Sequence, residues 1–264
     1  MEKIDGSNTF WHLSFFGRGK NEVLATLENH LNTSSKLLKI FTPNPEQLVQ
    51  ASQDRDFSEN LTQADILLPD GVGILWASRV LCSEPPIKER ITGIDVASRL
   101  ISLADDKRYA VLVIGGRDYQ VRGEGEDTQV KCLVEGKEIS IWWTPGYSAV
   151  KSPTPDEEAQ VKKMIERKKP SIVLLAFGAP WQEKWIIDHQ GLLEENDCKI
   201  AMAVGGTLDV LTGKSRRAPQ VIRNFGLEWL YRLLTQPWRW KRQLRLPIFI
   251  WLVLKERVTR PHQG

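Results

Sequence analysis

The sequence predicts an α/β fold in which helices cover both faces of a parallel β-sheet. Short apolar runs rich in Ile, Val and Leu end at Gly, Pro or Asn, and a helical pattern follows each run. Apolar strands that alternate with helices are typical of such a sheet, because both faces of each strand are buried. With 264 residues, 41% of them apolar, the chain can form a sizeable core. The predicted strands are residues 37–41, 65–68, 111–114, 139–142, 172–177 and 201–204.

The turns after these strands are expected to line one edge of the sheet. In an open parallel sheet the carboxyl ends of the strands gather along one edge, and ligands bind there. These turns offer a carboxylate, amides, hydroxyls, a tyrosine, and glycines whose N–H groups can approach an anion. The sequence therefore predicts a pocket that tolerates phosphate. The turns read TPNPEQ, PDGVG, GGRD, WTPGYS, GAPWQEKW and GGTLD.

Asp70 follows the predicted strand 65–68, between Pro69 and Gly71. In many proteins an Asp before Gly caps a helix or shapes a turn. At the ligand edge, the same carboxylate could accept a proton from an attacking hydroxyl, and nearby glycines allow a ligand to come close. From the residues alone, both interpretations of Asp70 stay open.

Other polar residues of these turns also carry two interpretations. Thr42 stands at a strand end where its hydroxyl can reach the pocket, and Asn44 fits the N-cap of the following helix. Gln182 opens a helix whose first turn favours anions, whereas its neighbour Glu183 fits a surface acid beside the helix dipole.

Three further residues come from the turns of the second half of the chain. Tyr147 could stack on a flat base or close a turn with its ring against the sheet. Gly206 follows Gly205 after the last predicted strand, and both offer N–H groups to an anion. Asp209 could bind a ribose or cap a helix.

Several cofactor and metal sites are not supported by the sequence. VIGGRD matches neither a dinucleotide fingerprint nor a P-loop, so we expect no nicotinamide cofactor or ATP. The DRD at 54–56 follows a helical stretch, which favours a solvated helix end over a metal site. The four histidines and three scattered cysteines show no ligand spacing and no disulfide framework, which is typical of a reducing cytosol. We therefore predict no metal and no cofactor.

A change in pattern near residue 213 predicts an α/β domain at 1–212 and a helical C-terminal appendage at 213–264. Residues 214–245 hold nine Lys or Arg but one acid, Glu228, so the rest of the chain is acidic although the net charge is +3. Basic and aromatic residues interleave there, which suits nucleic acid or a membrane surface. The apolar run 246–254 favours lipid. In a third interpretation, the appendage packs on the core of its own chain or on another subunit.

We expect neither a secretory leader nor a membrane-spanning segment in this sequence. The first residues lack a basic region followed by an apolar core, and no segment approaches the roughly 20 apolar residues of a spanning helix. We therefore expect membrane association, if it occurs, to be peripheral.

Six collinear segments, covering nearly the whole chain, resemble the WecG/TagA/CpsF family, which is glycosyltransferase family 26. The resemblance implies a Rossmann-like fold called GT-E. It also implies transfer of a sugar, with inversion and without a metal, from a UDP-sugar to a polyprenyl-diphosphate-linked acceptor at the bacterial cytoplasmic membrane. The segments are TPNPEQ, DGVGILWASR, ERITGID, GAPWQEKW, AVGGTLDVLTGKSRRAP and GLEWLYRLLTQPWRWKRQ.

The resemblance also implies roles for matching residues. Asp70 corresponds to the proposed general base, and Thr42 and Gln182 belong to the same catalytic group. Arginines of the appendage are thought to close over the diphosphate when the appendage docks on the membrane. The donor would be held by Asn44, Arg90, Gly205, Gly206, Tyr147 stacking on uracil, and Asp209 holding the nucleoside. The matching arginines are Arg232, Arg239 and Arg242.

The chain departs from the family pattern at several positions. Pro69 replaces the usual Ala before the aspartate, and Trp181 replaces the Lys of the usual PKQE turn. KPS at 169–171 replaces KPD, and Leu208 with Asp209 replaces FD. The lost lysine bears on donor preference, so N-acetylmannosamine, its uronate and glucose all remain open as the sugar.

Taken together, the sequence favours a membrane-associated glycosyltransferase of bacterial surface polysaccharide synthesis. Its expected partners are a UDP-sugar, a lipid-diphosphate-linked saccharide and the inner face of the cell membrane, with no nucleic acid; a homo-oligomer is also allowed. An inverting transfer needs one base and a stabiliser for the departing UDP, and clustered arginines can supply the latter. The alternatives are a nucleic-acid-binding protein that uses the same appendage and an inactive membrane-associated scaffold.

Overall fold

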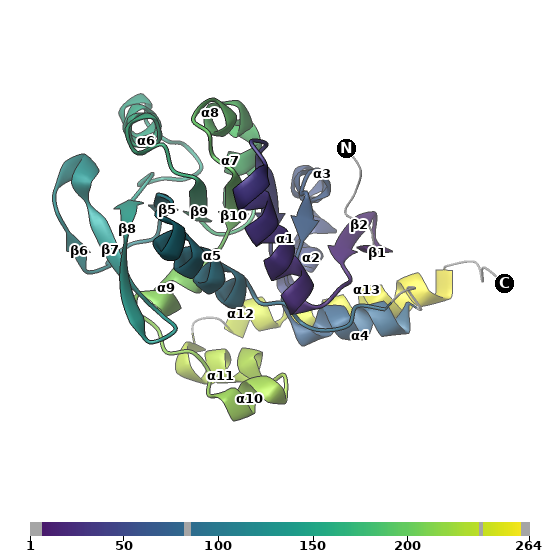
Figure 1. Ribbon diagram of the computed structural model, residues 1–264. Helices are drawn as coiled ribbons and strands as arrows, with labels where there is room; N and C mark the ends of the chain where they lie inside the picture. Colours follow the sequence, from purple (N-terminus) through teal and green to yellow (C-terminus); the bar gives the residue numbers. More distant parts are fainter. Residues whose placement is uncertain (1–6, 82–85, 238–239, 260–264) are drawn as a thin grey trace.

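The structure is a computed structural model of the chain that describes residues 7–81, 86–237 and 240–259. Within these ranges, ten strands form one sheet in the order β1-β2-β4-β3-β10-β9-β5-β8-β7-β6 (Figure 1). The seven strands from β2 to β8 in this order pair in parallel, and β1, β7 and β6 extend the two ends antiparallel. The α/β fold with a mostly parallel sheet, predicted from the sequence, is confirmed.

The strands are β1 Ser7–Phe10, β2 Leu13–Phe16, β3 Leu38–Phe41, β4 Ile66–Leu67, β5 Val111–Gly115, β6 Val121–Arg122, β7 Gln129–Val134, β8 Lys137–Thr144, β9 Ile172–Ala176 and β10 Ile200–Ala203. The helices are α1 Lys20–Thr33, α2 Pro45–Ala51, α3 Arg55–Thr62, α4 Val72–Val80, α5 Gly93–Lys107, α6 Pro155–Lys168, α7 Trp181–Asp188, α8 Gln190–Glu195, α9 Thr207–Leu211, α10 Gln220–Asn224, α11 Glu228–Thr235, α12 Trp240–Gln243 and α13 Arg245–Thr259, with a 3-10 turn, η1, at Gly125–Asp127.

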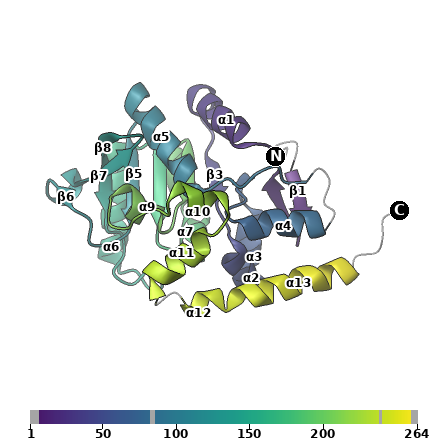
Figure 2. The ribbon, with the colours of Figure 1, turned by 90° about the horizontal axis from the view of Figure 1, so that it is seen from below.

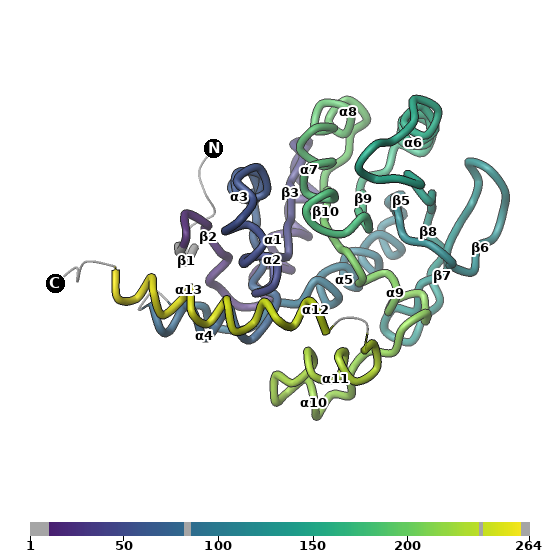
Figure 3. The backbone as a smooth tube through the Cα atoms, turned by 180° about the vertical axis from the view of Figure 1, so that it is seen from behind, coloured from purple at the N-terminus to yellow at the C-terminus, as the bar shows by residue number. Residues whose placement is uncertain are grey.

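Each central strand feeds two separate cores, because successive side chains of a strand point to opposite faces. In β5, Leu112 and Ile114 join the core formed with α2, α3, α6 and α7, whereas Val111 and Val113 join the core formed with α1, α5 and α9. The same alternation holds in β9 and β10. Helices therefore cover both faces of the sheet (Figures 1 and 3).

All six predicted strands are present, and two hairpins add strands that were not predicted. The segment 116–129, expected as a loop or helix start, includes β6 and η1 and leads into β7. Glu135 and Gly136, both with positive φ, form the two-residue turn between β7 and β8. Trp11 and His12, with φ of 50° and 62°, form the corresponding turn between β1 and β2.

The C-terminal helix α13 packs along α2 and α4 (Figures 2 and 3). Phe249 and Val253 of α13 are buried in the core shared with α2 and α3. The Phe249 ring lies edge-on to Trp11, with 5.6 Å between ring centres. Gln243 donates to Glu46 at 2.9 Å. These contacts fasten the appendage to the domain that precedes it.

Substituting Phe249 with Ala is expected to lower the free energy of unfolding by about 3 kcal/mol, because a fully packed aromatic ring is removed from a core. Phe249 is 2% exposed. Urea unfolding followed by tryptophan fluorescence measures the change. Leu254→Ala on the same helix is the control, since Leu254 is 49% exposed and should change stability by less than about 0.5 kcal/mol. Equal effects of the two variants would show that α13 is not anchored as described.

No helix within the described residues combines the length and the apolar content that a bilayer crossing requires.

Candidate active site

A cavity of about 560 Å³ lies between the α/β part of the chain and its C-terminal helices. The turns before α2 and α4 form one wall, and α11, α12 and α13 form the other. Four charged or polar residues predicted for the site line this cavity together with Asp70. They are Asn44, Arg90, Arg232 and Arg242. The structure thus brings the strand-end carboxylate and two appendage arginines to one cavity; Arg239, the third predicted arginine, lies outside the described residues.

Asp70 does not cap the helix that follows it. Gly71, with φ of 131°, is the N-cap of α4, and no side-chain hydrogen bond caps the N-terminus of that helix. The Asp70 Oδ2 instead accepts a long hydrogen bond, 3.4 Å, from the backbone N–H of Gly93. Burial raises the pKa of Asp70 above its ordinary value, while the guanidinium groups of Arg232 and Arg90 oppose this rise. A carboxylate with a raised pKa in a cavity is suited to proton transfer.

The glycines after Asp70 have a packing role in addition to the one expected. A Cβ at Gly73 would lie 2.7 Å from Cγ of Pro45, and one at Gly71 would lie 3.0 Å from Pro45 Cδ. The two glycines therefore let α4 approach the Pro45 ring at the start of α2. Close approach of a ligand is not the only reason for glycine at these positions.

Thr42 and Asn44 hold the turn after β3. Asn44 accepts from the backbone N–H of Gln47 at 3.0 Å, while the Gln47 side chain accepts from the Asn44 N–H, which is a complete capping box. Thr42 donates to the carbonyl of Ala203 at 3.3 Å. A Cβ at Gly93 would lie 3.4 Å from Thr42 Oγ1, so this hydroxyl lies beside the N–H that binds Asp70.

Gln182 connects two turns at the ligand edge of the sheet. Its Oε1 accepts from the N–H groups of Gly178, at 3.2 Å, and Gly205, at 2.9 Å. Its Nε2 donates to Glu183 at 2.8 Å. The expectation that Glu183 is a surface acid is wrong, because its side chain faces the interior and it is 1% exposed. Burial raises the pKa of Glu183 to about 7.

Neither Tyr147 nor Asp209 lines the cavity. The Tyr147 ring is buried and stacks on Phe177, and its oxygen accepts from the Trp185 indole at 2.6 Å. Asp209 lies inside α9 rather than at its N-cap, and it accepts from the Tyr119 hydroxyl at 3.1 Å. The roles predicted for these two residues in holding a nucleoside stay predictions.

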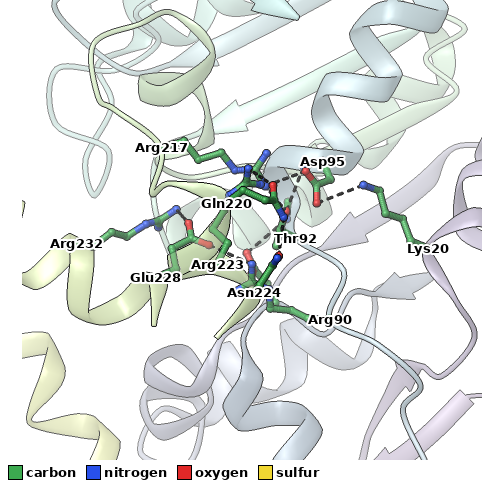
Figure 4. A network of polar contacts seen from close by, with 12 residues as sticks. Lys20, Arg90, Thr92, Asp95, Arg217, Gln220, Arg223, Asn224, Glu228 and Arg232 are labelled. Atoms are coloured by element: carbon green, nitrogen blue, oxygen red, sulfur yellow. Dashed lines mark hydrogen bonds and ion pairs between the residues drawn. The ribbon is translucent and has the colours of Figure 1, made fainter. Parts of the chain in front are cut away.

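An ion-pair network links the α/β part of the chain to the segment that holds α10 and α11 (Figure 4). Glu228 pairs with Arg90 at 3.2 Å and with Arg232 at 2.7 Å. Asp95 pairs with Arg217 at 2.8 Å and with Lys20 at 3.4 Å. Burial alone would raise the pKa of Asp95, but Arg217, and to a smaller extent Lys20, hold this pKa below its ordinary value. Sequence reasoning missed Glu228 as a site residue. Its position as the lone acid in a basic stretch was the available signal.

The DRD at 54–56 lies at the start of α3, whereas the solvated end of the preceding helical stretch was expected. Asp54 is the N-cap of α3 and accepts from the Phe57 N–H at 3.0 Å. Among the residues that the structure describes, no three or more His, Cys, Asp or Glu gather as a metal-binding group.

Comparison with known proteins adds the family. The sequence model described as "Glycosyl transferase WecG/TagA/CpsF family" matches residues 9–263. The chain belongs to the WecG/TagA/CpsF family of glycosyl transferases. The resemblance inferred from six segments is thereby confirmed.

Three relatives carry the name N-acetylglucosaminyldiphosphoundecaprenol N-acetyl-beta-D-mannosaminyltransferase. The one from Bacillus subtilis (strain 168) is 31% identical over 251 residues, which is 95% of this chain and 92% of the relative. The Bacillus spizizenii protein is 34% identical over 245 residues, 90% of each chain. The Staphylococcus aureus (strain MRSA252) protein is 33% identical over 227 residues, 85% of this chain and 82% of the relative.

Proposed function

We propose that this member of the WecG/TagA/CpsF family transfers a sugar from a UDP-sugar to a polyprenyl-diphosphate-linked saccharide, with inversion and without a metal. The observation that carries the proposal is the single cavity shared by Asp70, Arg90, Arg232 and Arg242. The names of the relatives support an acceptor built on N-acetylglucosaminyl diphosphoundecaprenol and N-acetylmannosamine as the sugar. The UDP carrier is our inference.

The cavity supplies the two elements that such a reaction needs. Asp70, once ionised, accepts the proton of the acceptor hydroxyl as that oxygen forms a bond with the anomeric carbon. The bond from that carbon to the diphosphate breaks on the opposite face, and its electron pair moves to the departing phosphate oxygen. Arg90, Arg232 and Arg242 stabilise the charge that develops there, because guanidinium groups bind phosphate oxygens in a bidentate manner.

A panel of UDP-sugars tested with a synthetic lipid-diphosphate-linked N-acetylglucosamine tests this proposal. We expect transfer from one UDP-sugar, with an inverted anomeric configuration in the product by NMR, and activity that persists in excess EDTA. Absence of transfer from every UDP-sugar, with folded protein, would overturn the proposed function. Transfer that EDTA abolishes would overturn the metal-independent mechanism alone.

We further propose that the appendage docks the enzyme on the inner face of the cell membrane. The helices α4, α10, α11, α12 and α13 lie on one side of the molecule (Figures 1 and 2). Exposed apolar side chains on this side include Phe225 at 75%, Leu234 at 73% and Trp251 at 58%. Lys241 and Lys255 lie over the rings of Trp240 and Trp251. Trp beside Lys is typical of the headgroup level of a bilayer. The apolar side chains favour lipid over nucleic acid.

Replacing Trp251 and Leu254 together with Glu is expected to weaken binding to anionic vesicles by about tenfold or more, because two inserted apolar side chains are lost and negative charge is added. Vesicle flotation at two salt concentrations measures the change, and higher salt should weaken but not abolish wild-type binding. Leu133→Glu on β7 is the matched control, since Leu133 is 63% exposed on a different element. Strong oligonucleotide binding without vesicle binding would contradict the proposal.

A further inference from the structure

Glu228 bridges two arginines that come from different parts of the chain. Its Oε1 accepts from Nη2 of Arg232, one turn later on α11, at 2.7 Å, and its Oε2 accepts from Nη2 of Arg90, before α5, at 3.2 Å (Figure 4). The Glu228 side chain is 11% exposed, and the Arg90 side chain 17%. All three residues line the cavity that contains Asp70. One carboxylate thus holds together both arginines that face the candidate base.

The stability of the fold does not by itself explain this arrangement. A buried ion pair gains little net stability, because the attraction between the charges is offset by the cost of removing them from water. Glu228 does prevent a specific problem: without it, the guanidinium groups of Arg90 and Arg232, whose side chains are 17% and 38% exposed, would face each other across a partly buried site and repel. Each arginine bonds Glu228 through one of its nitrogens, and a guanidinium has five N–H donors. Donors therefore remain for an anion in the cavity.

We propose that Glu228 is a positioning residue that holds Arg90 and Arg232 side by side, at the separation at which they bind a substrate diphosphate. Glu228 acts through the arginines and does not contact the reacting atoms. The inference deepens the proposed function and rests on it. The diphosphate has two sources, the sugar nucleotide and the prenyl-linked acceptor, which share the same chemistry toward arginine.

A different role for Glu228 would change the affinity for a diphosphate in the opposite direction. If Glu228 merely occupied the place of the phosphate in the empty enzyme, removal of its charge would free the arginines and tighten binding of a diphosphate. If it positions the arginines, removal of its charge lets them move apart and weakens binding. Affinity for a diphosphate therefore separates the two roles without any measurement of turnover.

The test compares Glu228→Gln, Glu228→Asp and the wild type by titration calorimetry with UDP and with geranyl diphosphate. We expect Glu228→Gln to weaken binding of at least one of them by about fivefold or more, and Glu228→Asp, which keeps the charge, to fall between. Glu59→Gln, which removes an exposed i,i+4 pair with Arg55 on α3, is the matched control and should leave affinity unchanged. Unchanged or tighter binding by Glu228→Gln would overturn the inference.

The pH profile of kcat/KM gives a second readout, whose direction separates positioning from a purely structural role. The charged groups that face Asp70 are Arg232, Arg90 and Glu228, and Glu46 and Arg242 also line the cavity. If Glu228 positions the arginines, its replacement lets Arg90 and Arg232 move away from Asp70, and the acid limb shifts toward higher pH because both guanidinium groups lower the pKa of Asp70. An acid limb that is unmoved, or that shifts toward lower pH because only a negative neighbour is lost, would count against the inference. Should Glu228→Gln fail to fold, Glu228→Asp carries both measurements, with smaller changes of the same sign.

The proposed function and this inference fail in different ways. If the wild type transfers no sugar but Glu228→Gln still weakens diphosphate binding, the proposed function fails and the positioning role stands. If the wild type transfers sugar and Glu228→Gln matches it in diphosphate affinity and in turnover, the positioning role fails alone.

Discussion

Substituting Asp70 with Asn is expected to lower kcat by about 10²–10⁴-fold while leaving the affinity for UDP within about threefold of the wild type, because the amide keeps the size of the carboxylate but cannot accept a proton. The expected loss is large since no second carboxylate is assigned to this step. Single-turnover transfer to the lipid-diphosphate acceptor gives kcat, and calorimetry gives the affinity.

The pH dependence of the wild type provides a second check on Asp70. Only the ionised carboxylate acts as a base, and burial raises its pKa. Activity should therefore fall as the pH drops through this raised pKa, at a higher pH than for an ordinary aspartate. Asp56→Asn, an exposed residue of α3, is the control and should retain wild-type turnover. Near-wild-type turnover in Asp70→Asn would refute the assignment of the base.

Substituting both Arg90 and Arg232 with Gln is expected to lower kcat/KM by about 10²–10³-fold or more. Each substitution removes a guanidinium group that stabilises the charge developing on the departing diphosphate. The two guanidinium groups also lower the pKa of Asp70. Their removal should therefore move the acid limb of the pH profile upward, in the same direction as the shift expected for Glu228→Gln. Steady-state kinetics over a range of pH measures both effects.

The control for the arginines is Arg55→Gln, which removes an exposed arginine of α3 and should change kcat/KM by less than about twofold. Thermal unfolding of all variants excludes loss of folded protein as the cause. If the Arg90 and Arg232 double variant kept the wild-type kcat/KM, the arginines would have no part in stabilising the leaving group.

The central strands could be predicted from the sequence because they are buried on both faces. A strand such as β9, Ile172–Ala176, carries an unbroken apolar run, and such a run has few other stable arrangements. The edge strand β6 is exposed, and its neighbour β7 alternates buried with more exposed residues, so the pattern of this region competes with that of a loop. The turn at Glu135 and Gly136 was the signal that this region forms a hairpin.

The candidate site could be predicted only in part. Asp70 and Asn44 follow strands, so the topology of a parallel sheet brings them to one edge. The approach of Arg232 and Arg242 depends on how α13 packs along α2 and α4, which no local pattern determines. The burial of Glu183 was missed for the same reason, because its position in the first turn of α7 fits a surface acid equally well.

The crystal structure of the Asp70→Asn variant with a UDP-sugar and a short-chain prenyl-diphosphate-linked N-acetylglucosamine tests the central claim most directly. We expect the acceptor hydroxyl within about 3.2 Å of the substituted side chain at position 70, the distance required for direct proton transfer in the wild type. Guanidinium groups of Arg90 and Arg232 should bind a diphosphate in the same cavity. A diphosphate and hydroxyl bound elsewhere, out of reach of both position 70 and the arginines, would contradict the account.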